Sequence, residues 1–244
     1  MAKCCAKNGF DLVVCSEGDR IHNVAKDFAG ANNKVEVVQA DLSTLDGVNK
    51  LCSAIEGRPV DALLANAGVG LGKGFLEQDP EAWRNIIDLN ITGTLALIQE
   101  VALGMRDRGE GRILITGSIA RFMPGSFQAV YNGSKAFLDS FSFALRNELK
   151  DTGITVTCLM PGATQTEFFE RADLMDTKVG QSKKEDPAIV AERGFKAMMD
   201  GDAEVISGWM NKMRAAMGSI MPAQVTAEMH RKKTAPGTGK QSAA

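Results

Sequence analysis

Short apolar runs alternate with helix-length amphipathic segments along most of the chain, and this alternation constrains the fold more than any other feature. The apolar runs predict strands, and the longer segments between them predict helices. Parallel strands need such long crossover segments, so we expect an α/β, doubly wound parallel sheet covered on both faces, in a single domain. The expected strands are 11–15, 35–39, 60–65, 112–116, 154–159 and 204–206, and the expected helices are 20–29, 44–56, 79–107, 128–150, 186–200 and 208–220.

The size and charge of the chain limit its class. Its 244 residues are enough for one large domain with a substantial core, and the net charge of −2 gives no general attraction to nucleic acid or to anionic membranes. No stretch approaches 18 uninterrupted apolar residues, and the N-terminus lacks a signal-peptide pattern. We therefore expect neither nucleic acid nor a membrane as a partner.

The cysteines and histidines favour neither disulfides nor a metal. The five cysteines form no CxxC pair, which is typical of a protein in a reducing cytoplasm. His22 and His230 are the two histidines, and they lie far apart without ligand-like neighbours. No metal centre is expected.

The first residues are unusual for a doubly wound fold. Residues 2–8 followed by Gly9 predict the end of a helix with its glycine cap. A dinucleotide-binding fold needs a strand and a glycine-rich turn before that helix, and neither is present. Either the chain begins inside a longer natural sequence, or the fold was trimmed. The glycine-rich run 68–74 lacks both GxGxxG spacing and a Ser or Thr after Gly-Lys, so it predicts a flexible loop near the substrate.

The most specific chemical signal is Tyr131 followed by Lys135 in an expected helix. The i, i+4 spacing places the phenol and the ammonium on one face, and a nearby cation favours the phenolate. Tyr131, the single tyrosine, is therefore expected to exchange protons near neutral pH. Ser118 follows an expected strand, where α/β folds gather ligand groups, so its hydroxyl could hold a carbonyl beside the phenol.

The run Gly117-Ser118, followed by Tyr131 and Lys135 with Ser134 directly before the lysine, resembles the active site of short-chain dehydrogenases/reductases. Further motifs fall in the order of that family over residues 9–166. They are Asp41-Leu42, Asn66-Ala67-Gly68, Asn90 in Asp88-Leu89-Asn90, Pro161-Gly162 and Thr164 to Thr166.

The resemblance implies a Rossmann-type fold and a function. Tyr131 would transfer the proton, Lys135 would bind the nicotinamide ribose and lower the phenol pKa, Ser118 would position the substrate, and Asn90 would support the proton relay. Residues 1–222 would form the NAD(P)-binding domain and 223–244 a polar, flexible tail. The protein would oxidise a secondary alcohol or reduce a carbonyl as a cytoplasmic homodimer or homotetramer. The remaining cofactor contacts would be Glu17, Asp41, Leu42, Asn66, Ala67, Gly68, Pro161, Gly162 and Thr164.

One departure from the family pattern is serious. The family's TGxxxGxG turn, which holds the pyrophosphate, has no match, and the strand before it is central to the sheet. We therefore expect an open sheet and a chain that binds cofactor poorly, with low stability or activity. This leaves a non-catalytic binding or regulatory protein on the same scaffold as the alternative. A hydrolytic dyad of Ser118 or Ser134 with Lys135 is disfavoured, because no nucleophile elbow is present.

Several interpretations stay open on the residues alone. Glu17 would accept hydrogen bonds from a ribose 2′-hydroxyl and leans the cofactor towards NAD, whereas Arg20 keeps NADP open. Asp41 could instead cap the next helix, and Ser118 could cap its strand end. Met210, Met213, Met217 and Met221 have helical spacing and could face the core, a substrate lid or a subunit interface.

Overall fold

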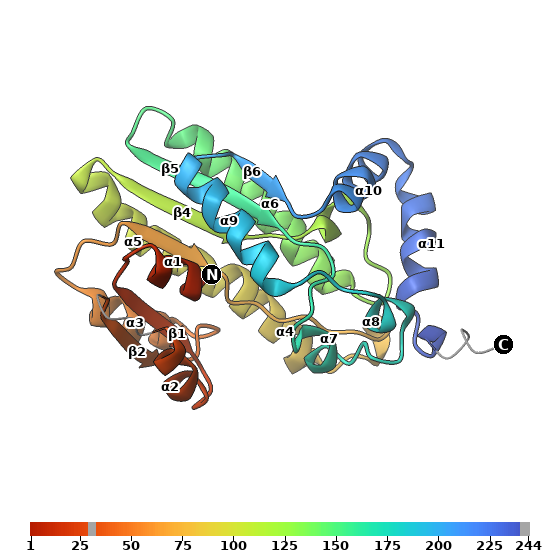
Figure 1. Cartoon of the computed structure of the whole chain (residues 1–244). Helices are drawn as coiled ribbons and strands as arrows, with labels where there is room; N and C mark the ends of the chain where they lie inside the picture. Colours follow the sequence, from red (N-terminus) through yellow and green to blue (C-terminus); the bar gives the residue numbers. More distant parts are fainter. Residues whose placement is uncertain (29–32, 240–244) are drawn as a thin grey trace.

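The computed structural model describes residues 1–28 and 33–239 and confirms the expected α/β architecture (Figure 1). Every expected strand forms. Their bounds are β1 Leu12–Ser16, β2 Val35–Gln39, β3 Ala62–Ala65, β4 Gly111–Thr116, β5 Ile154–Met160 and β6 Glu204–Ile206. All the strand pairs are parallel, as the helix-length connections require.

The expected helices also form, with three differences. The regular helices are α1 Ala2–Lys7, α3 Leu45–Ile55, α4 Pro80–Ile87, α5 Thr94–Arg108, α6 Ala129–Glu148, α9 Pro187–Asp200 and α10 Trp209–Ile220. The segment expected at 20–29 is a short helix, α2 Ile21–Val24, with a 3-10 turn to Asp27, and its last residue lies outside the described residues. The stretch expected as one helix at 79–107 is broken by a π-helical turn, Asp88–Gly93. Three helices that the sequence did not predict are α7 Phe168–Arg171, α8 Lys178–Gln181 and α11 Ala223–Thr234.

Local sequence sets the helix ends. The side chains of Asp79 and Asp186 each accept a hydrogen bond from the first turn of α4 and α9, and each is followed by a proline at the first helical position. Thr44 caps α3 through Gly47. Gly109 and Gly201 end α5 and α9 in the left-handed region, where glycine carries no Cβ penalty.

The sheet is divided into two pieces. One has the order β1-β2 and the other β3-β4-β5-β6, and no described strand joins them. β1 and β3 each pair with one neighbour, so each leaves one edge of backbone donors and acceptors without a ladder partner among the described strands. The expected open sheet is therefore present.

Helices cover both faces of the divided sheet (Figure 1). On one face α3, α5 and α6 pack against both pieces in a single apolar cluster that includes Val38, Val101, Ile113 and Val156. On the other face α9 packs against the larger piece around Leu114, Leu159, Val190 and Met198, and Met1 joins that cluster. The two pieces are thus held together by helix packing and not by a hydrogen-bonded ladder.

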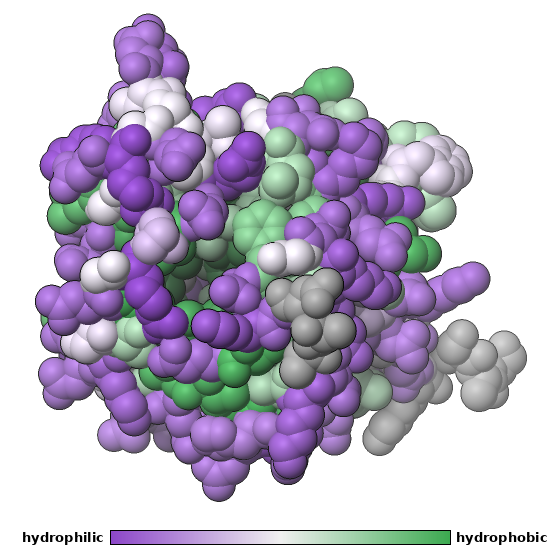
Figure 2. Space-filling view, turned by 60° about the vertical axis from the view of Figure 1, so that its left-hand side comes forward, coloured by the Kyte–Doolittle hydropathy of each residue, from purple (hydrophilic) through white to green (hydrophobic). Residues whose placement is uncertain are grey.

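The strands beside the break in the sheet are less buried than the strand in the middle of the larger piece. The β4 residues Ile113, Leu114 and Ile115 are fully buried, whereas the β1 residues Leu12 to Cys15 and the β3 residues Ala62 to Leu64 are only half-buried. Figure 2 shows a hollow with apolar side chains on its walls. Strands in the middle of a parallel sheet are normally buried on both faces, so β1 and β3 behave as edges.

The π-helical turn lies within the 29-residue helical stretch Pro80–Arg108, which is long and apolar enough by composition to cross a membrane. In this molecule Leu97, Ile98 and Val101 of that stretch belong to the buried core. The turn ends at Gly93, which lies directly against the carbonyl oxygen of Leu42 in the loop after β2. A Cβ at position 93 would overlap that oxygen.

Replacing Gly93 by alanine is expected to destabilise the protein by about 1–3 kcal/mol, because the clash is with backbone that cannot rotate away. For a domain of this size that is a fall in Tm of roughly 2–12 °C, measurable by circular dichroism. Gly104→Ala on the exposed side of α5 is the matched control, since the new methyl would meet only the end of the Arg108 side chain. The control should raise stability by up to about 1 kcal/mol through helix propensity. Equal Tm values for the two variants would contradict the close approach at Gly93.

The C-terminal region corrects one expectation. The tail expected to be flexible from residue 223 instead contains α11, in which Thr226 and Thr234 are buried. Thr234 and His230 both contact the carbonyl oxygen of Ser126, at 2.8 and 3.0 Å, so the helix is pinned to the loop before α6. The polar composition of the segment hid these local contacts. The last part of the expected tail, 240–244, lies outside the described residues.

The methionine stripe of α10 is only partly described. Met210 and Met213 are about half exposed, so the core-facing interpretation is wrong for these two side chains. Trp209 is also exposed. The buried face of α10 is formed instead by Asn211 and Ala215.

Candidate active site

The predicted catalytic residues meet at the carboxyl ends of β3, β4 and β5. Each strand ends in a tight segment that begins with a predicted motif: Asn66 after β3, Gly117-Ser118 after β4 and Pro161-Gly162 after β5. The segments are joined by main-chain hydrogen bonds, from Gly117 to Leu159 (2.8 Å) and from Ile119 to Pro161 (3.2 Å). The carboxyl ends of parallel strands share one sheet edge, which is why residues far apart in sequence converge there.

Asn90 projects from the π-helical turn and is fully buried. Its side-chain oxygen accepts the Val69 N–H at 2.9 Å, and its amide donates to the Val69 carbonyl and to the Ser134 hydroxyl, each at 3.0 Å. Asn90 therefore ties the loop after β3 to α6. A π-helical turn, frequent at functional sites, supplies this orientation, and the helical period of the sequence did not predict it.

Lys135 is almost completely buried, and its ammonium donates to the Thr116 carbonyl at 2.8 Å. Gly68 lets the loop after β3 approach it closely, since a Cβ at position 68 would lie 3.3 Å from the Lys135 Nζ and 3.1 Å from the Asn90 Oδ1. Desolvation lowers the pKa of Lys135 to about 8. The charge on Lys135 therefore titrates close to neutral pH.

Tyr131 lies one turn before Lys135 on α6, with the Phe168 ring 5.1 Å from its own. Burial raises the pKa of the Tyr131 phenol to about 12, although hydrogen bonding to Ser118 opposes the rise. This differs from the expectation that Lys135 depresses the phenol pKa. The reason is that desolvation of the phenolate is the largest effect and that the Lys135 ammonium is directed at the Thr116 carbonyl. The phenol is a proton donor in this state.

Ser118 is buried beside Tyr131, and its hydroxyl also accepts a hydrogen bond from the Ala120 N–H at 3.0 Å. It caps the 3-10 turn Ile119–Phe122 that follows the strand, which differs from the expected capping of the strand end. Asn132 holds the far side of that turn through the carbonyls of Ala120 and Met123. Asn132 was not predicted as a site residue, because the recognisable spacing belongs to its neighbour Tyr131 and to Lys135.

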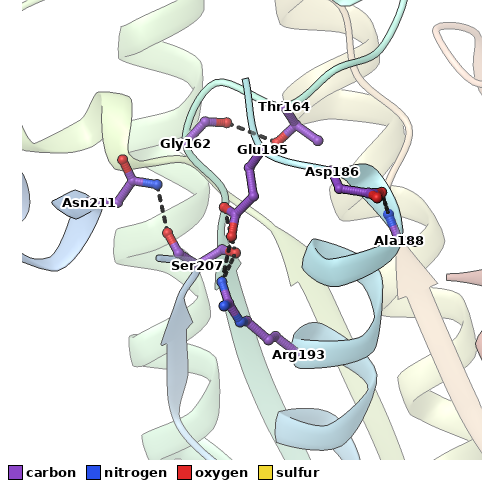
Figure 3. A network of polar contacts seen from close by, with 8 residues as sticks. All are labelled: Gly162, Thr164, Glu185, Asp186, Ala188, Arg193, Ser207 and Asn211. Carbon is purple, nitrogen blue, oxygen red and sulfur yellow. Dashed lines mark hydrogen bonds and ion pairs between the residues drawn. The ribbon is translucent and has the colours of Figure 1, made fainter. Parts of the chain in front are cut away.

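Polar contacts order the loop after β5 (Figure 3). Thr164 donates to the Gly162 carbonyl at 3.0 Å, and Glu185 pairs with the loop through Ala163 and Gln165, each at 2.9 Å. The Glu185 carboxylate in turn accepts from Ser207 at 2.8 Å and pairs with Arg193. A Cβ at position 162 would overlap the Asn211 amide, so a larger residue there would displace that side chain. The loop is therefore supported by α9, β6 and α10.

The predicted adenosine-side residues form a separate group at the ends of β1 and β2. Glu17 and Asp41 line one surface pocket together with Gln39, Asp46 and Lys50. Asp41 does not cap α3 directly: Thr44 does so, while Asp41 accepts the Ser43 N–H at 2.9 Å. Leu42 packs into the core and presents its carbonyl to Gly93. Asn66 accepts a hydrogen bond from Thr116, and Ala67 is exposed beside it.

An ion pair spans the two groups. Arg20, directly before α2, binds Glu167 through its two terminal guanidinium nitrogens, at 3.0 and 2.7 Å. The hydrogen bonds from Arg20 and Arg171 lower the pKa of Glu167. Glu167 precedes Phe168, whose ring lies beside both Tyr131 and Gly70. The loop 68–74, predicted to be flexible, is tethered to the same segment by the Gly72 N–H to the Ala172 carbonyl (2.7 Å) and by the Lys73–Asp173 ion pair.

Comparison with known proteins agrees with this arrangement. Residues 1–176 match the family model described as short chain dehydrogenase. The chain is 32% identical over 195 residues to an oxidoreductase of Myxococcus xanthus, covering 77% of this chain and 73% of that one. It is 30% identical over 191 residues to an NADP-dependent 3-hydroxy acid dehydrogenase of Salmonella typhi, covering 76% of each.

A solved structure is similar over nearly the whole molecule. The short-chain dehydrogenase of Sphingobium yanoikuyae in complex with NADPH superposes with a TM-score of 0.79 at 25% identity, over 91% of this chain and 90% of that one. These relatives support NAD(P) as the cofactor class. They do not support the lean towards NAD that Glu17 suggested, since the names of the last two specify the phosphorylated cofactor.

Proposed function

Because this chain belongs to the short-chain dehydrogenase family, we propose that it transfers a hydride between NAD(P)(H) and a secondary alcohol or carbonyl substrate, with Tyr131 as the acid–base group. The observation that carries the proposal is the convergence of Asn90, Ser118, Tyr131 and Lys135 at one sheet edge. When bound, the nicotinamide cofactor supplies or accepts the hydride. The chain supplies orientation and the proton.

The residues present fit such a cofactor at its two ends. Glu17 and Asp41 line a polar pocket suited to the adenosine ribose. At the other end the Lys135 ammonium lies beside Gly68, which has no side chain to cover it. The described residues contain no glycine-rich turn at a helix N-terminus for the pyrophosphate. Arg20 is paired with Glu167, so it would bind a 2′-phosphate only after that ion pair breaks. Both NAD and NADP are therefore tested.

In the reduction direction, the Tyr131 phenol would donate its proton to the substrate oxygen while the Ser118 hydroxyl holds that oxygen in place. The raised phenol pKa keeps the donor protonated at neutral pH. A charged Lys135 beside the developing phenolate would lower the cost of proton loss, and Asn90 would fix the loop around both groups. In the oxidation direction the same phenol must first lose its proton, so that direction should gain rate as the pH rises.

Two further parts of the proposal concern assembly and location. The helices α5 and α6 expose Leu103 and Phe137, and the rings of Phe137 and Phe141 stack 6.2 Å apart. We infer that these helices form the faces of a homodimer or homotetramer in the cytoplasm. The substrate is proposed as a small molecule, without nucleic acid or membrane partners.

The rival proposal is a non-catalytic binding or regulatory protein on the same scaffold. The divided sheet of the described strands is the observation that favours it. The complete set of four active-site residues opposes it, since a scaffold without chemistry has no use for a buried lysine one helical turn from a partly buried phenol.

The deciding experiment is a titration of NADH and NADPH followed by the fluorescence of Trp83 and Trp209, with turnover of a ketone and aldehyde panel measured by cofactor absorbance. We expect saturable binding of at least one cofactor and cofactor oxidation that depends on the carbonyl. Binding without turnover would favour the regulatory scaffold. Failure to bind either cofactor would reject the enzyme for this chain.

A further inference from the structure

A buried carboxylate lies next to the proposed catalytic residues of α6, and it takes no part in the proton transfer proposed above. Asp139 follows Lys135 by one helical turn on α6 and is fully buried. Its Oδ1 accepts a hydrogen bond from the Cys158 thiol of β5 at 3.3 Å, and the nearby main chain of Ser118 favours the ionised carboxylate. Gly117 is packed so tightly against it that a Cβ there would overlap Oδ1. Asp139 thus contacts the segment that carries the Ser118 hydroxyl.

The second oxygen of Asp139 is differently placed. Among the described residues Oδ2 accepts no hydrogen bond, and it faces the Arg121 Nε at 3.6 Å. Arg121 belongs to the 3-10 turn that Ser118 caps, and its guanidinium lies over the Phe122 ring. Asp139 therefore holds the turn at both ends, through the Ser118 main chain and through the Arg121 charge. A buried carboxylate with one poorly paired oxygen is readily protonated there.

The charged and titratable groups that face Asp139 come from three elements. They are Arg121 in the 3-10 turn, Tyr131 and Lys135 on α6, and Cys158 on β5. Burial raises the pKa of Asp139 to about 6, against the lowering effects of Cys158, Arg121 and Lys135. The negative charge of Asp139 in turn raises the pKa values of both Lys135 and Tyr131. Its ionisation state is therefore felt at both groups.

From these contacts we propose that Asp139 is a positioning residue whose ionised carboxylate fixes the Ser118 segment beside Tyr131 and supports the charge of Lys135. The proposal rests on the proposed function for its consequence in catalysis, but not for its geometry. Above the pKa of Asp139 the carboxylate attracts the Ser118 main chain and the Arg121 guanidinium. Below that pKa both attractions weaken, and the Ser118 hydroxyl is no longer held against the phenol.

The single tyrosine allows a direct test that needs no turnover. Full-length protein labelled with ¹³Cζ-tyrosine gives one resonance, from Tyr131, and its shift is followed between pH 4.5 and 7, below the pKa of Lys135. The phenol itself does not ionise in this range, because its pKa is near 12. We expect a step with a midpoint near pH 6, reporting the ionisation of Asp139. A wild-type resonance without a step in this region would overturn the proposal.

Two variants and a control identify the titrating group. Asp139→Asn should abolish the step, whereas Arg121→Gln should move it about one pH unit higher, because the cation that favours the carboxylate is gone. Glu148→Gln, which removes a carboxylate from the exposed end of the same helix, should leave the step unchanged. A step that persists in Asp139→Asn would assign it to another group, such as His230, and overturn the proposal. Should Asp139→Asn fail to fold, the Arg121→Gln midpoint decides.

Kinetics then separate this proposal from the proposed function. With cofactor and carbonyl substrate, the wild-type kcat should fall below about pH 6, and Asp139→Asn should lose that acid limb with a kcat roughly 10- to 100-fold lower and an unchanged KM. A merely structural role would lower the amount of active protein without changing the pH profile. A Tyr131 step without turnover on either cofactor would reject the enzyme while upholding the coupling to Asp139.

Discussion

Replacing Tyr131 by phenylalanine is expected to lower kcat for carbonyl reduction by about 10²- to 10⁴-fold, which is the usual contribution of a positioned proton donor. The substitution removes one hydroxyl and keeps the ring, so its contact with Phe168 is retained. Lys135 and the pocket lined by Glu17 and Asp41 are untouched. The cofactor Kd should therefore stay within about twofold while turnover collapses, as measured by steady-state kinetics and fluorescence titration.

The matched control is Ser140→Ala, which removes one hydroxyl from the exposed side of the same helix. It should leave both kcat and the cofactor Kd unchanged. If the Tyr131→Phe variant kept more than about a tenth of the wild-type kcat, another group would be the proton donor. Lys135 would then be the first candidate, because it lies one helical turn from Tyr131 and its pKa of about 8 allows it to donate a proton near neutral pH.

Filling the break between β1 and β3 should stabilise the whole molecule. We expect an N-terminal extension of five alternating valine and alanine residues, joined by a short glycine-rich linker, to form a parallel strand paired with both free edges. Burial of the valine side chains and main-chain hydrogen bonds to both free edges favour pairing, and the ordering of the added backbone opposes it. A net gain of roughly 2 kcal/mol corresponds to a rise in Tm of roughly 4–8 °C.

The control extension carries proline at its central position, which removes a ladder donor and is excluded from central strands. It should leave Tm near that of the parent chain. Hydrogen exchange gives the location, because the amides of Leu12–Ser16 and Ala62–Ala65 should become protected only with the valine extension. Equal stabilisation by the proline version would show that the extension packs elsewhere.

The sequence predicted the strands and the long helices well because their signals are local and repeated. β5 is a run of β-branched and apolar residues that must be buried, and α6 has a strong apolar face. The helices α7, α8 and α11 were missed because they are short or polar and are held by tertiary contacts, such as those of Thr234 with Ser126. The π-helical turn was missed because a single extra residue per turn leaves the apolar pattern nearly unchanged.

The same limit explains which site residues could be found. Tyr131 and Lys135 have a fixed spacing on one helix, so the pair is visible in sequence. Asp139 lies on the same helical face as Lys135, yet its partners Ser118, Arg121 and Cys158 come from a turn and a different strand. A buried carboxylate can be recognised only when its neighbours are known. The phenol pKa was misjudged for the same reason, because burial is a property of the fold and not of spacing.

The ion pair between Arg20 and Glu167 joins the segment that follows β1 to the segment that contacts Tyr131 through Phe168. Arg20 lies three residues after Glu17, which lines the pocket at the ends of β1 and β2, and Glu167 begins the segment that places the Phe168 ring beside Tyr131. A ligand group that captured Arg20 would leave the Glu167 carboxylate with Arg171 alone. Coupling free energies are reciprocal. A ligand at one of these segments that changed the affinity of a ligand at the other would therefore have its own affinity changed by the same factor. Cooperativity between cofactor and substrate would then be set by an exposed contact, sensitive to salt, and not by the buried core.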